Sequence, residues 1–264
     1  MMRPFKPLRT ILFLIVLAAG CPAAEPQGIE ALRKTNFNAG WVFKLGDYPK
    51  ASKAVFDDSQ WDAVEIPHDW SIEGPIERGN PSGSQGGYYP CGIGYYRKTF
   101  PFDPAWEGKL VQITFDGIMA NSEVWINGHL LGKRPNGYVG FTYDLTPHLK
   151  KAENVLTVRA DNEKQPASRW YTGCGIYRNV WLGIKHKVSV AQHGTYVIAK
   201  NITDASAEIW IETTIDNHAE KNAPIELVSE IYNPAGEKVA EQASETTAGK
   251  NDSAVLKQKI AVKN

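Results

Sequence analysis

The sequence predicts an all-β protein, with a jelly-roll β-sandwich over residues 30–186 followed by an immunoglobulin-like β-sandwich over residues 187–264. Short segments of alternating apolar and polar residues recur along the chain, and turn residues separate them. Helical periodicity is almost absent from the first of these domains. A hydrophobic content of 42% with Trp 8, Gly 23 and Pro 16 is typical of packed sheets joined by tight turns.

Charge and motif content exclude several function classes. Lys+Arg 29 balance Asp+Glu 29, so no electrostatic attraction to nucleic acid is expected. The histidines and cysteines lack the spacing of a metal site, and no glycine-rich loop opens a helix as a nucleotide-binding loop does. We therefore expect no metal, no cofactor and no nucleic-acid partner.

The first 24 residues are expected to be a signal peptide. Arg3, Lys6 and Arg9 form a basic start, and Ile11–Ala19 is an apolar run too short to cross a bilayer in the mature protein. The chain is therefore expected to be exported.

Two ways of processing this leader remain open. Leu17–Cys21 resembles a bacterial lipoprotein site, which makes Cys21 the candidate lipidation residue and implies a lipid anchor in a membrane. An ordinary cut after Ala23 or Ala24 fits the sequence nearly as well. A lipoprotein would be expected in the periplasm or anchored in the outer membrane. Secretion from the cell is the other expected outcome.

The first domain is expected to consist of short strands and tight turns. Asn127-Gly128 is the two-residue signal of a type I′ hairpin. Asp103-Pro104 and Thr146-Pro147 each indicate a single helical turn. Residues 71–94 form a long irregular loop, of the length that often carries function. The expected strands are Tyr95–Phe100, Leu110–Phe115, Glu123–Ile126, His129–Leu131 and Asn154–Ala160.

Strict alternation marks the second domain. Apolar residues occupy every second position of residues 207–215, and turn residues at 217–222 and 233–236 separate further strands. Fewer residues follow position 186 than the about 100 that an immunoglobulin-like sandwich usually takes. We therefore expect this domain to be truncated.

An aromatic stretch from Ser168 to Leu182 closes the first domain. Gly173 and Gly175 suit a sharp turn, and a strand is expected from Ile176 onwards. The turn would bring Arg169, Trp170 and Tyr171 to the mouth of a sheet. An aromatic face covers the C–H face of a sugar, and a guanidinium donates to its hydroxyl groups. The alternative is that these aromatic residues only fill the core.

Seven groups of residues, in this order, resemble the N-terminal, galactose-binding-like domain of family 2 glycoside hydrolases. The resemblance is closest to the β-galactosidase branch, and residues 187–264 look like the start of the family's immunoglobulin-like domain. The groups are Phe56–Trp70 with its Pro67-His-Asp-Trp sequence, Gly94–Arg97, Asp116-Gly117, Val124–Gly128, Tyr143–Leu145, Asn154-Val155 and Ser168–Arg178.

The resemblance implies a (β/α)₈ barrel carrying two catalytic glutamates, which this chain does not include. Hydrolysis of O-glycosyl bonds would then belong to the full-length enzyme, so we expect no catalytic residue here. The family's acid/base glutamate follows an asparagine. We interpret the pair found here, Asn162-Glu163, as a solvated turn.

The resemblance also implies which residues touch a β-galactoside-like sugar. In the family, two loops of this domain reach the edge of the active site. Arg169 is the main candidate, although some relatives carry an acidic residue there. Trp170 and Tyr171 would shape the wall of the site, with Tyr89 contributed by the other loop.

Cys91 and Cys174 are a candidate disulfide. Each lies in a Cys-Gly-Ile sequence, on loops that the family fold brings near each other. Oxidising compartments favour such bonds.

Three function classes remain. We favour the N-terminal, non-catalytic part of an exported β-galactosidase-type hydrolase. The alternatives are a free-standing carbohydrate-binding module and a structural surface protein built of β-sandwiches.

Overall fold

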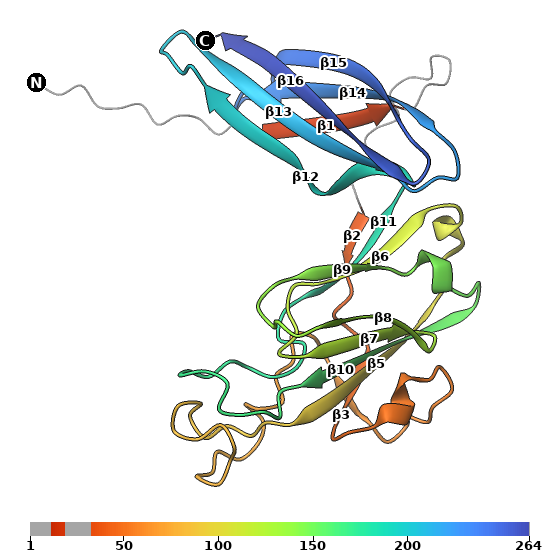
Figure 1. Cartoon of the computed structure of the whole chain (residues 1–264), viewed down its shortest axis with the longest axis vertical. Helices are drawn as coiled ribbons and strands as arrows, with labels where there is room; N and C mark the ends of the chain where they lie inside the picture. Colours follow the sequence, from red (N-terminus) through yellow and green to blue (C-terminus); the bar gives the residue numbers. More distant parts are fainter. Residues whose placement is uncertain (1–11, 19–32, 264) are drawn as a thin grey trace, which may run out of the picture. The chain divides into compact units, whose positions relative to one another are not determined.

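The structure, a computed structural model, describes residues 12–18 and 33–263. Among the described residues, the regular secondary structure is β-strand apart from three short 3₁₀ turns, which confirms the predicted all-β fold class (Figure 1). It divides into two compact units. One comprises Leu32–Lys185, and the other comprises His186–Asn264 together with Met1–Ala31.

Two sheets form the unit Leu32–Lys185. All pairings between neighbouring strands are antiparallel. The six-stranded sheet has the order β4 (Asp62–Val64), β3 (Trp41–Leu45), β5 (Ile93–Pro101), β10 (Glu153–Asp161), β7 (Ser122–Ile126) and β8 (His129–Arg134). The four-stranded sheet has the order β2 (Arg33–Asn36), β11 (Val180–Lys185), β6 (Leu110–Phe115) and β9 (Phe141–Asp144).

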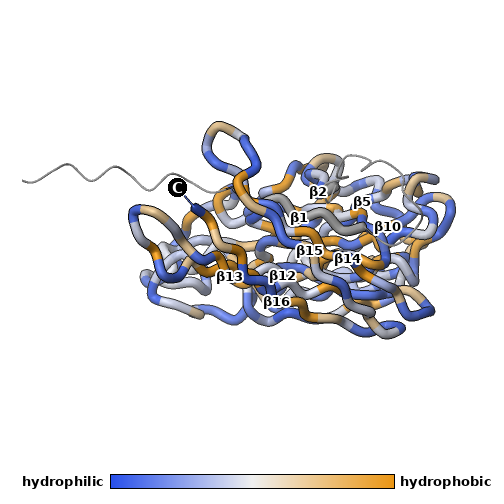
Figure 2. Tube along the Cα trace, turned by 90° about the horizontal axis from the view of Figure 1, so that it is seen from above, coloured by the Kyte–Doolittle hydropathy of each residue, from blue (hydrophilic) through white to orange (hydrophobic). Residues whose placement is uncertain are grey.

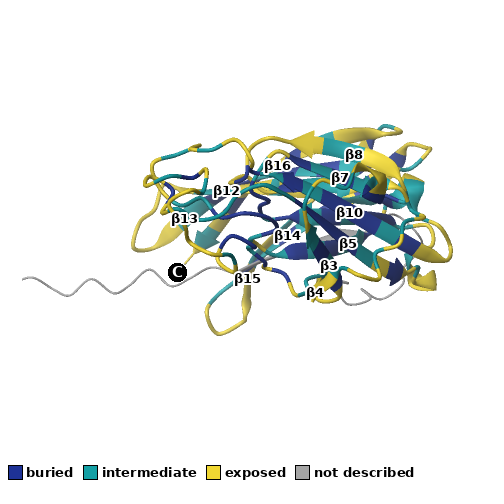
Figure 3. Ribbon diagram, turned by 90° about the horizontal axis from the view of Figure 1, so that it is seen from below, coloured by how far each residue is buried: buried dark blue, intermediate teal, exposed yellow. Residues whose placement is uncertain are grey.

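Alternating apolar residues of both sheets meet in one core, as expected for a sandwich. The inward side chains of β6 include Ile113 and Phe115, which are completely buried, and those of β10 include Leu156 and Val158. In Figure 3 the central strands β5, β7 and β10 carry the buried residues, while the surrounding loops are exposed. This core fixes the ends of the strands from which the long loops leave.

Local turns follow the expected chemistry. Asn127 and Gly128 have φ values of 52° and 89°, as a type I′ hairpin between β7 and β8 requires. Two of the 3₁₀ turns, η2 (Pro104–Trp106) and η3 (Thr146–His148), lie where the sequence predicted them. A third, η1 (Pro49–Ser52), precedes β4.

A buried arginine ties the segment before β4 to the six-stranded sheet. Arg97 on β5 is only 2% exposed, and its Nε donates to Asp58 Oδ2 at 2.6 Å. Its Nη1 donates to the carbonyl oxygen of Lys53 at 3.0 Å and to Thr157 Oγ1 at 3.1 Å. A buried charge needs this degree of pairing to be tolerated.

The second unit also contains two antiparallel sheets. Inward residues of both sheets, among them Ile215, Leu227 and Leu256, share an apolar cluster. Figure 2 shows hydrophobic residues along its strands and hydrophilic residues at its turns. One sheet has the order β12 (Val188–Lys200), β13 (Ser206–Asn217) and β16 (Asp252–Lys263), and the other has the order β1 (Leu12–Ala18), β14 (Ala223–Tyr232) and β15 (Lys238–Ala248).

Strand β1 lies within the expected leader. Its backbone pairs with β14 over seven positions, from Leu12 with Tyr232 to Ala18 with Glu226. The rest of the leader, Cys21 included, lies outside the described residues. Among the described residues, no helix has both the length and the apolar character needed to cross a membrane.

One predicted strand start is wrong. Residues from Ile176 were expected to be a strand, but β11 begins at Val180. Ile176 is fully buried, and it follows a two-residue bridge in which Gly175 and Met119 exchange hydrogen bonds of 2.8 and 2.9 Å. The segment 176–179 therefore packs against the core without joining the ladder.

Candidate functional site

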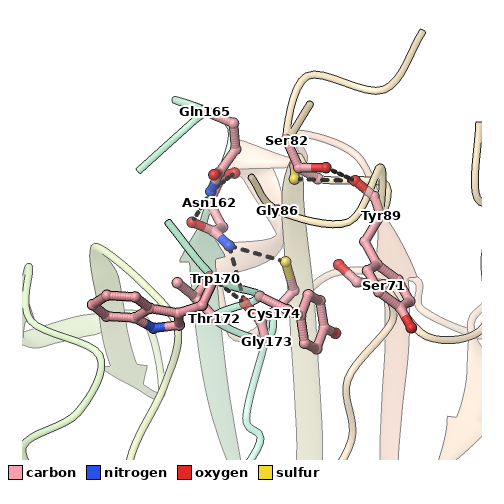
Figure 4. Close-up of a pocket in the computed structure, with 12 residues that line it drawn as sticks. Ser71, Ser82, Gly86, Tyr89, Asn162, Gln165, Trp170, Thr172, Gly173 and Cys174 are labelled. Atoms are coloured by element: carbon pink, nitrogen blue, oxygen red, sulfur yellow. Dashed lines mark hydrogen bonds between the residues drawn. The ribbon is translucent and has the colours of Figure 1, made fainter. Parts of the chain in front are cut away.

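A small pocket lies between the two long loops of the first unit, at residues 71–91 and 162–174. It has a free volume of about 10 Å³, enough for about one water molecule. Ligand sites that enclose small molecules usually measure about 300–1,000 Å³. The pocket is therefore too small to enclose a sugar. Figure 4 shows its lining residues, Ser71, Ser82, Gly86, Tyr89, Cys91, Asn162, Gln165, Trp170, Tyr171, Thr172, Gly173 and Cys174.

The turn Gly173-Cys-Gly175 has the geometry predicted for it. Both glycines have positive φ values, 81° and 84°. A Cβ atom at Gly175 would lie 2.1 Å from the Tyr96 hydroxyl and 2.9 Å from Trp70, so no other residue fits there. The turn is thus pressed against the core of the sandwich, which fixes Cys174 and Tyr171.

Asp69 anchors this turn from the other loop. Its Oδ1 accepts the backbone N–H of Cys174 at 3.0 Å and the backbone N–H of Ser71 at 3.0 Å. Its Oδ2 accepts a hydrogen bond from the Tyr171 hydroxyl. Its neighbour Trp70 is buried and stacks on Phe43, with ring centroids 5.4 Å apart. The core thus holds Asp69 in place.

Tyr89 and Tyr171 form what we call the aromatic wall. Their ring centroids lie 4.3 Å apart, at an interplanar angle of 39°. Both residues are partly exposed. Burial, and then the hydrogen bond to Asp69, raises the pKa of Tyr171, which keeps the phenol protonated as a donor. The structure thus brings together two of the four predicted sugar-binding residues in direct contact.

The other two predicted residues lie at the edge of the pocket or outside it. Trp170 is 60% exposed, and its Nε1 donates to the Tyr138 hydroxyl at 3.1 Å. Arg169 is exposed and does not line this small pocket, so its expected contact with a sugar stays a prediction. Within residues 33–263 it has no ion-pair partner, so its guanidinium is free to meet a ligand from solvent.

Asn162 contradicts the solvated turn that the sequence suggested. It is 5% exposed, and its Nδ2 donates to the carbonyl oxygen of Gly173 and to Cys174 Sγ, both at 3.0 Å. Its backbone N–H donates to the carbonyl oxygen of Gly92 at 2.9 Å. Asn162 therefore connects both loops at the pocket floor, while its neighbour Glu163 is exposed as expected.

The two cysteines lie at the same pocket but are not bonded. Both are free thiols in this structure, Cys174 buried and Cys91 half-buried. Burial raises the pKa of Cys174 to about 12 and also raises the pKa of Cys91. Over the described part of the chain, no three His, Cys, Asp or Glu side chains gather in a way that could hold a metal ion.

Sequence reasoning missed several residues that build this site, namely Asp69, Ser71, Ser82, Asn162 and Gln165. The one available signal was the motif Pro67-His-Asp-Trp70, because a polar residue between buried neighbours often has a specific partner. The partners of these residues are distant in the sequence, so local patterns cannot show them.

Comparison with known proteins identifies a matching family model and relatives of similar sequence. A model of the glycosyl hydrolase 2 galactose-binding domain-like family matches residues 95–190. The chain is 46% identical, over 231 residues, to Beta-galactosidase BoGH2A of Bacteroides ovatus, a match that covers 87% of this chain and 27% of the relative. It is 50% identical, over 169 residues, to a putative beta-glucuronidase of Formosa agariphila, covering 64% of this chain and 16% of the relative.

Solved structures of family 2 glycoside hydrolases have a similar fold. A glycosyl hydrolase family 2 member from Bacteroides cellulosilyticus superposes with a TM-score of 0.82 at 32% identity, over 88% of this chain and 31% of that chain. A β-glucuronidase of glycoside hydrolase family 2 gives a TM-score of 0.81 at 28% identity, over 90% of this chain and 27% of that chain.

The fold and these matches define the N-terminal β-sandwich domains of a glycoside hydrolase. The chain belongs to glycoside hydrolase family 2, as its motif series indicated. It spans about a quarter of the length of the Bacteroides ovatus relative.

Proposed function

We propose that this chain supplies one side of the sugar site of a β-galactosidase-type hydrolase and does not itself cleave glycosidic bonds. The observation that carries this proposal is the aromatic wall of Tyr89 and Tyr171, built by two loops that the core and Asp69 hold rigidly together. Aromatic rings cover the C–H faces of sugars, and hydrogen-bond donors of the protein beside such rings can reach the hydroxyl groups of the sugar.

The absence of turnover follows from the geometry of the reaction. Glycoside hydrolysis by the usual route needs two carboxyl groups about 5 to 9.5 Å apart across the scissile bond. Among the described residues, the pocket lining contains no carboxyl group. The missing groups would come from a catalytic barrel domain, the partner that the family resemblance implies.

An assay of the purified chain with chromogenic β-galactoside and β-glucuronide substrates tests this part. No turnover above the uncatalysed rate is expected. Turnover that survives Glu163→Gln but is lost when another carboxylate is replaced would overturn the proposal.

Galactose binding with a Kd below about 1 μM, near −8 kcal/mol or tighter, would instead indicate a free-standing module. Binding of no sugar at all would indicate a structural protein.

Arg169 favours a β-glucuronide as a second candidate ligand. Its guanidinium is exposed beside the site and has no ion-pair partner among the described residues. A uronate carboxylate could bind such a fork through two parallel hydrogen bonds. Arg169→Gln should then weaken methyl β-glucuronide binding several-fold and leave methyl β-galactoside binding unchanged. Equal losses for both sugars, or no loss for either, would contradict this role.

We also propose export, with residues 1–24 removed or with Cys21 lipidated in the outer membrane. The basic start and the apolar run support this proposal. Removal would take β1 away from β14 and free the edge of that strand. Mass spectrometry of the protein from its own cells should find a chain that begins near residue 21 to 25. A chain that still carries Met1 would contradict export by this route.

A further inference from the structure

Two cysteines on different loops line the same small pocket. Cys91 immediately precedes Gly92 and β5, whereas Cys174 occupies the tight turn between Gly173 and Gly175. Burial raises the pKa of the Cys91 thiol, as it does that of Cys174.

The surrounding hydrogen bonds hold these two segments side by side. Asn162 donates its side-chain Nδ2 to Cys174 Sγ at 3.0 Å (Figure 4). Its backbone N–H donates to the carbonyl oxygen of Gly92 at 2.9 Å, so one buried residue contacts both segments. Asp69 accepts the backbone N–H of Cys174 at 3.0 Å. The Cys91 thiol donates to the carbonyl oxygen of Tyr89 at 3.5 Å. The thiols are thus positioned relative to each other by the fold.

We propose that Cys91 and Cys174 are the site of a disulfide that clamps the loop of residues 71–91 onto the turn of residues 171–175. The bond would lie two residues from Tyr89 and three from Tyr171 along the chain, the two residues of the aromatic wall. The inference goes beyond the proposed function, because it depends only on the two loops and not on a sugar.

The chemistry is thiol–disulfide exchange with an external disulfide. The thiolate of one cysteine attacks a sulfur of that disulfide, which forms a mixed disulfide and releases one external thiol. The second cysteine then attacks the mixed bond, so that Cys91 and Cys174 are joined and a second external thiol leaves. The external disulfide is reduced to two thiols, and both protein thiols give up their protons.

Burial controls when this exchange can occur. The attacking species is the thiolate, and burial raises the pKa of Cys174 to about 12 in the folded, reduced protein. Little thiolate is therefore present at neutral pH once the pocket has closed. The exchange should occur while the loops are open during folding, and the folded, reduced protein should resist oxidation.

Peptide mapping tests the bond directly. The chain is refolded with oxidised and reduced glutathione at pH 8, its free thiols are alkylated in denaturant without reductant, and it is digested. A linked peptide containing Cys91 and Cys174 is expected, and it should vanish in Cys91→Ser and in Cys174→Ser. Alkylation of both cysteines in the refolded wild-type chain would overturn the proposal.

Two further measurements test the clamp and its timing. Amide hydrogen exchange of residues 71–91 should be roughly tenfold slower in the oxidised protein than in its reduced form, because the bond suppresses local opening. Equal exchange would overturn the clamp. The folded, reduced protein should react with oxidised glutathione at least about tenfold more slowly than the denatured protein. Equal rates would overturn the proposed timing.

Discussion

Tyr171 donates its phenolic hydrogen to Asp69, which lies 102 positions earlier in the chain. This bond joins the two loops that carry the aromatic wall. The same carboxylate accepts the backbone N–H groups of Ser71 and Cys174. Asp69 is thus the common acceptor for both sides of the pocket, and the wall depends on it.

Tyr171→Phe should therefore lower the free energy of unfolding by about 1.5–3 kcal/mol, the usual loss for a hydrogen bond to a charged group. Tyr177→Phe is the matched control, since its hydroxyl donates to the neutral carbonyl of Gly137 at 2.9 Å and should cost about 1 kcal/mol. Urea denaturation of both variants gives the comparison. An equal or larger loss for the Tyr177 variant would show that Asp69 does not hold the wall.

Asn162→Ala should destabilise the first unit by about 1–3 kcal/mol. The change removes one of the two side-chain donors to the carbonyl oxygen of Gly173, leaving only the Thr172 hydroxyl at 3.2 Å, and it removes the bond to Cys174 Sγ. The adjacent substitution Glu163→Gln is an internal control, because an exposed side chain should change stability by less than about 0.5 kcal/mol. Thermal or urea unfolding distinguishes the two. Similar effects would mean that Asn162 is a solvated turn residue after all.

Arg97→Met should cost about 3–5 kcal/mol, as for other buried ion pairs that lose one partner. The substitution leaves Asp58 and the carbonyl oxygen of Lys53 without the hydrogen bonds that Arg97 donates. Lys44→Met, which removes a surface contact to Asp62 at 3.7 Å, should cost less than about 1 kcal/mol. A loss below about 1 kcal/mol for Arg97→Met would show that Arg97 does not tie the segment before β4 to the six-stranded sheet.

Stability of the reduced protein should fall as the pH rises above 9. The folded-state pKa of Cys174 is about 12, whereas the unperturbed value is 9.0, so only the unfolded chain releases this proton in that window. The contribution of the protonated Cys174 thiol to the free energy of unfolding is complete below pH 9. It is lost towards pH 12, at up to about 1.4 kcal/mol per pH unit. Urea titrations in reductant at several pH values between 8 and 10 should show that the free energy of unfolding falls less steeply with pH in Cys174→Ser than in the wild-type chain. Identical slopes would contradict this assignment.

Local patterns predicted the parts of the fold that local chemistry determines. Asn127-Gly128 specified a type I′ turn, and the alternation of residues 207–215 specified β13. The predicted strand Leu110–Phe115 has the same bounds as β6. Each of these features depends on neighbours in the sequence, which is why the sequence alone sufficed.

Long-range contacts account for what sequence reasoning could not show. Ile176 has the spacing of a strand residue, but the bridge between Gly175 and Met119 delays the ladder until Val180. Asn162 lies in a polar run, and its partners at Gly173 and Cys174 become visible only when the loops are folded together.

Binding of a sugar at the aromatic wall is the central claim, and a titration followed by nuclear magnetic resonance tests it most directly. Methyl β-galactoside should shift amide signals of residues 69–91 and 162–175 with a Kd of about 1 mM or weaker, near −4 kcal/mol. Tyr171→Ala should abolish these shifts, whereas Tyr196→Ala, which replaces an exposed tyrosine of the other unit, should leave them unchanged. Shifts that persist in Tyr171→Ala, or that map only to other strands, would contradict the claim.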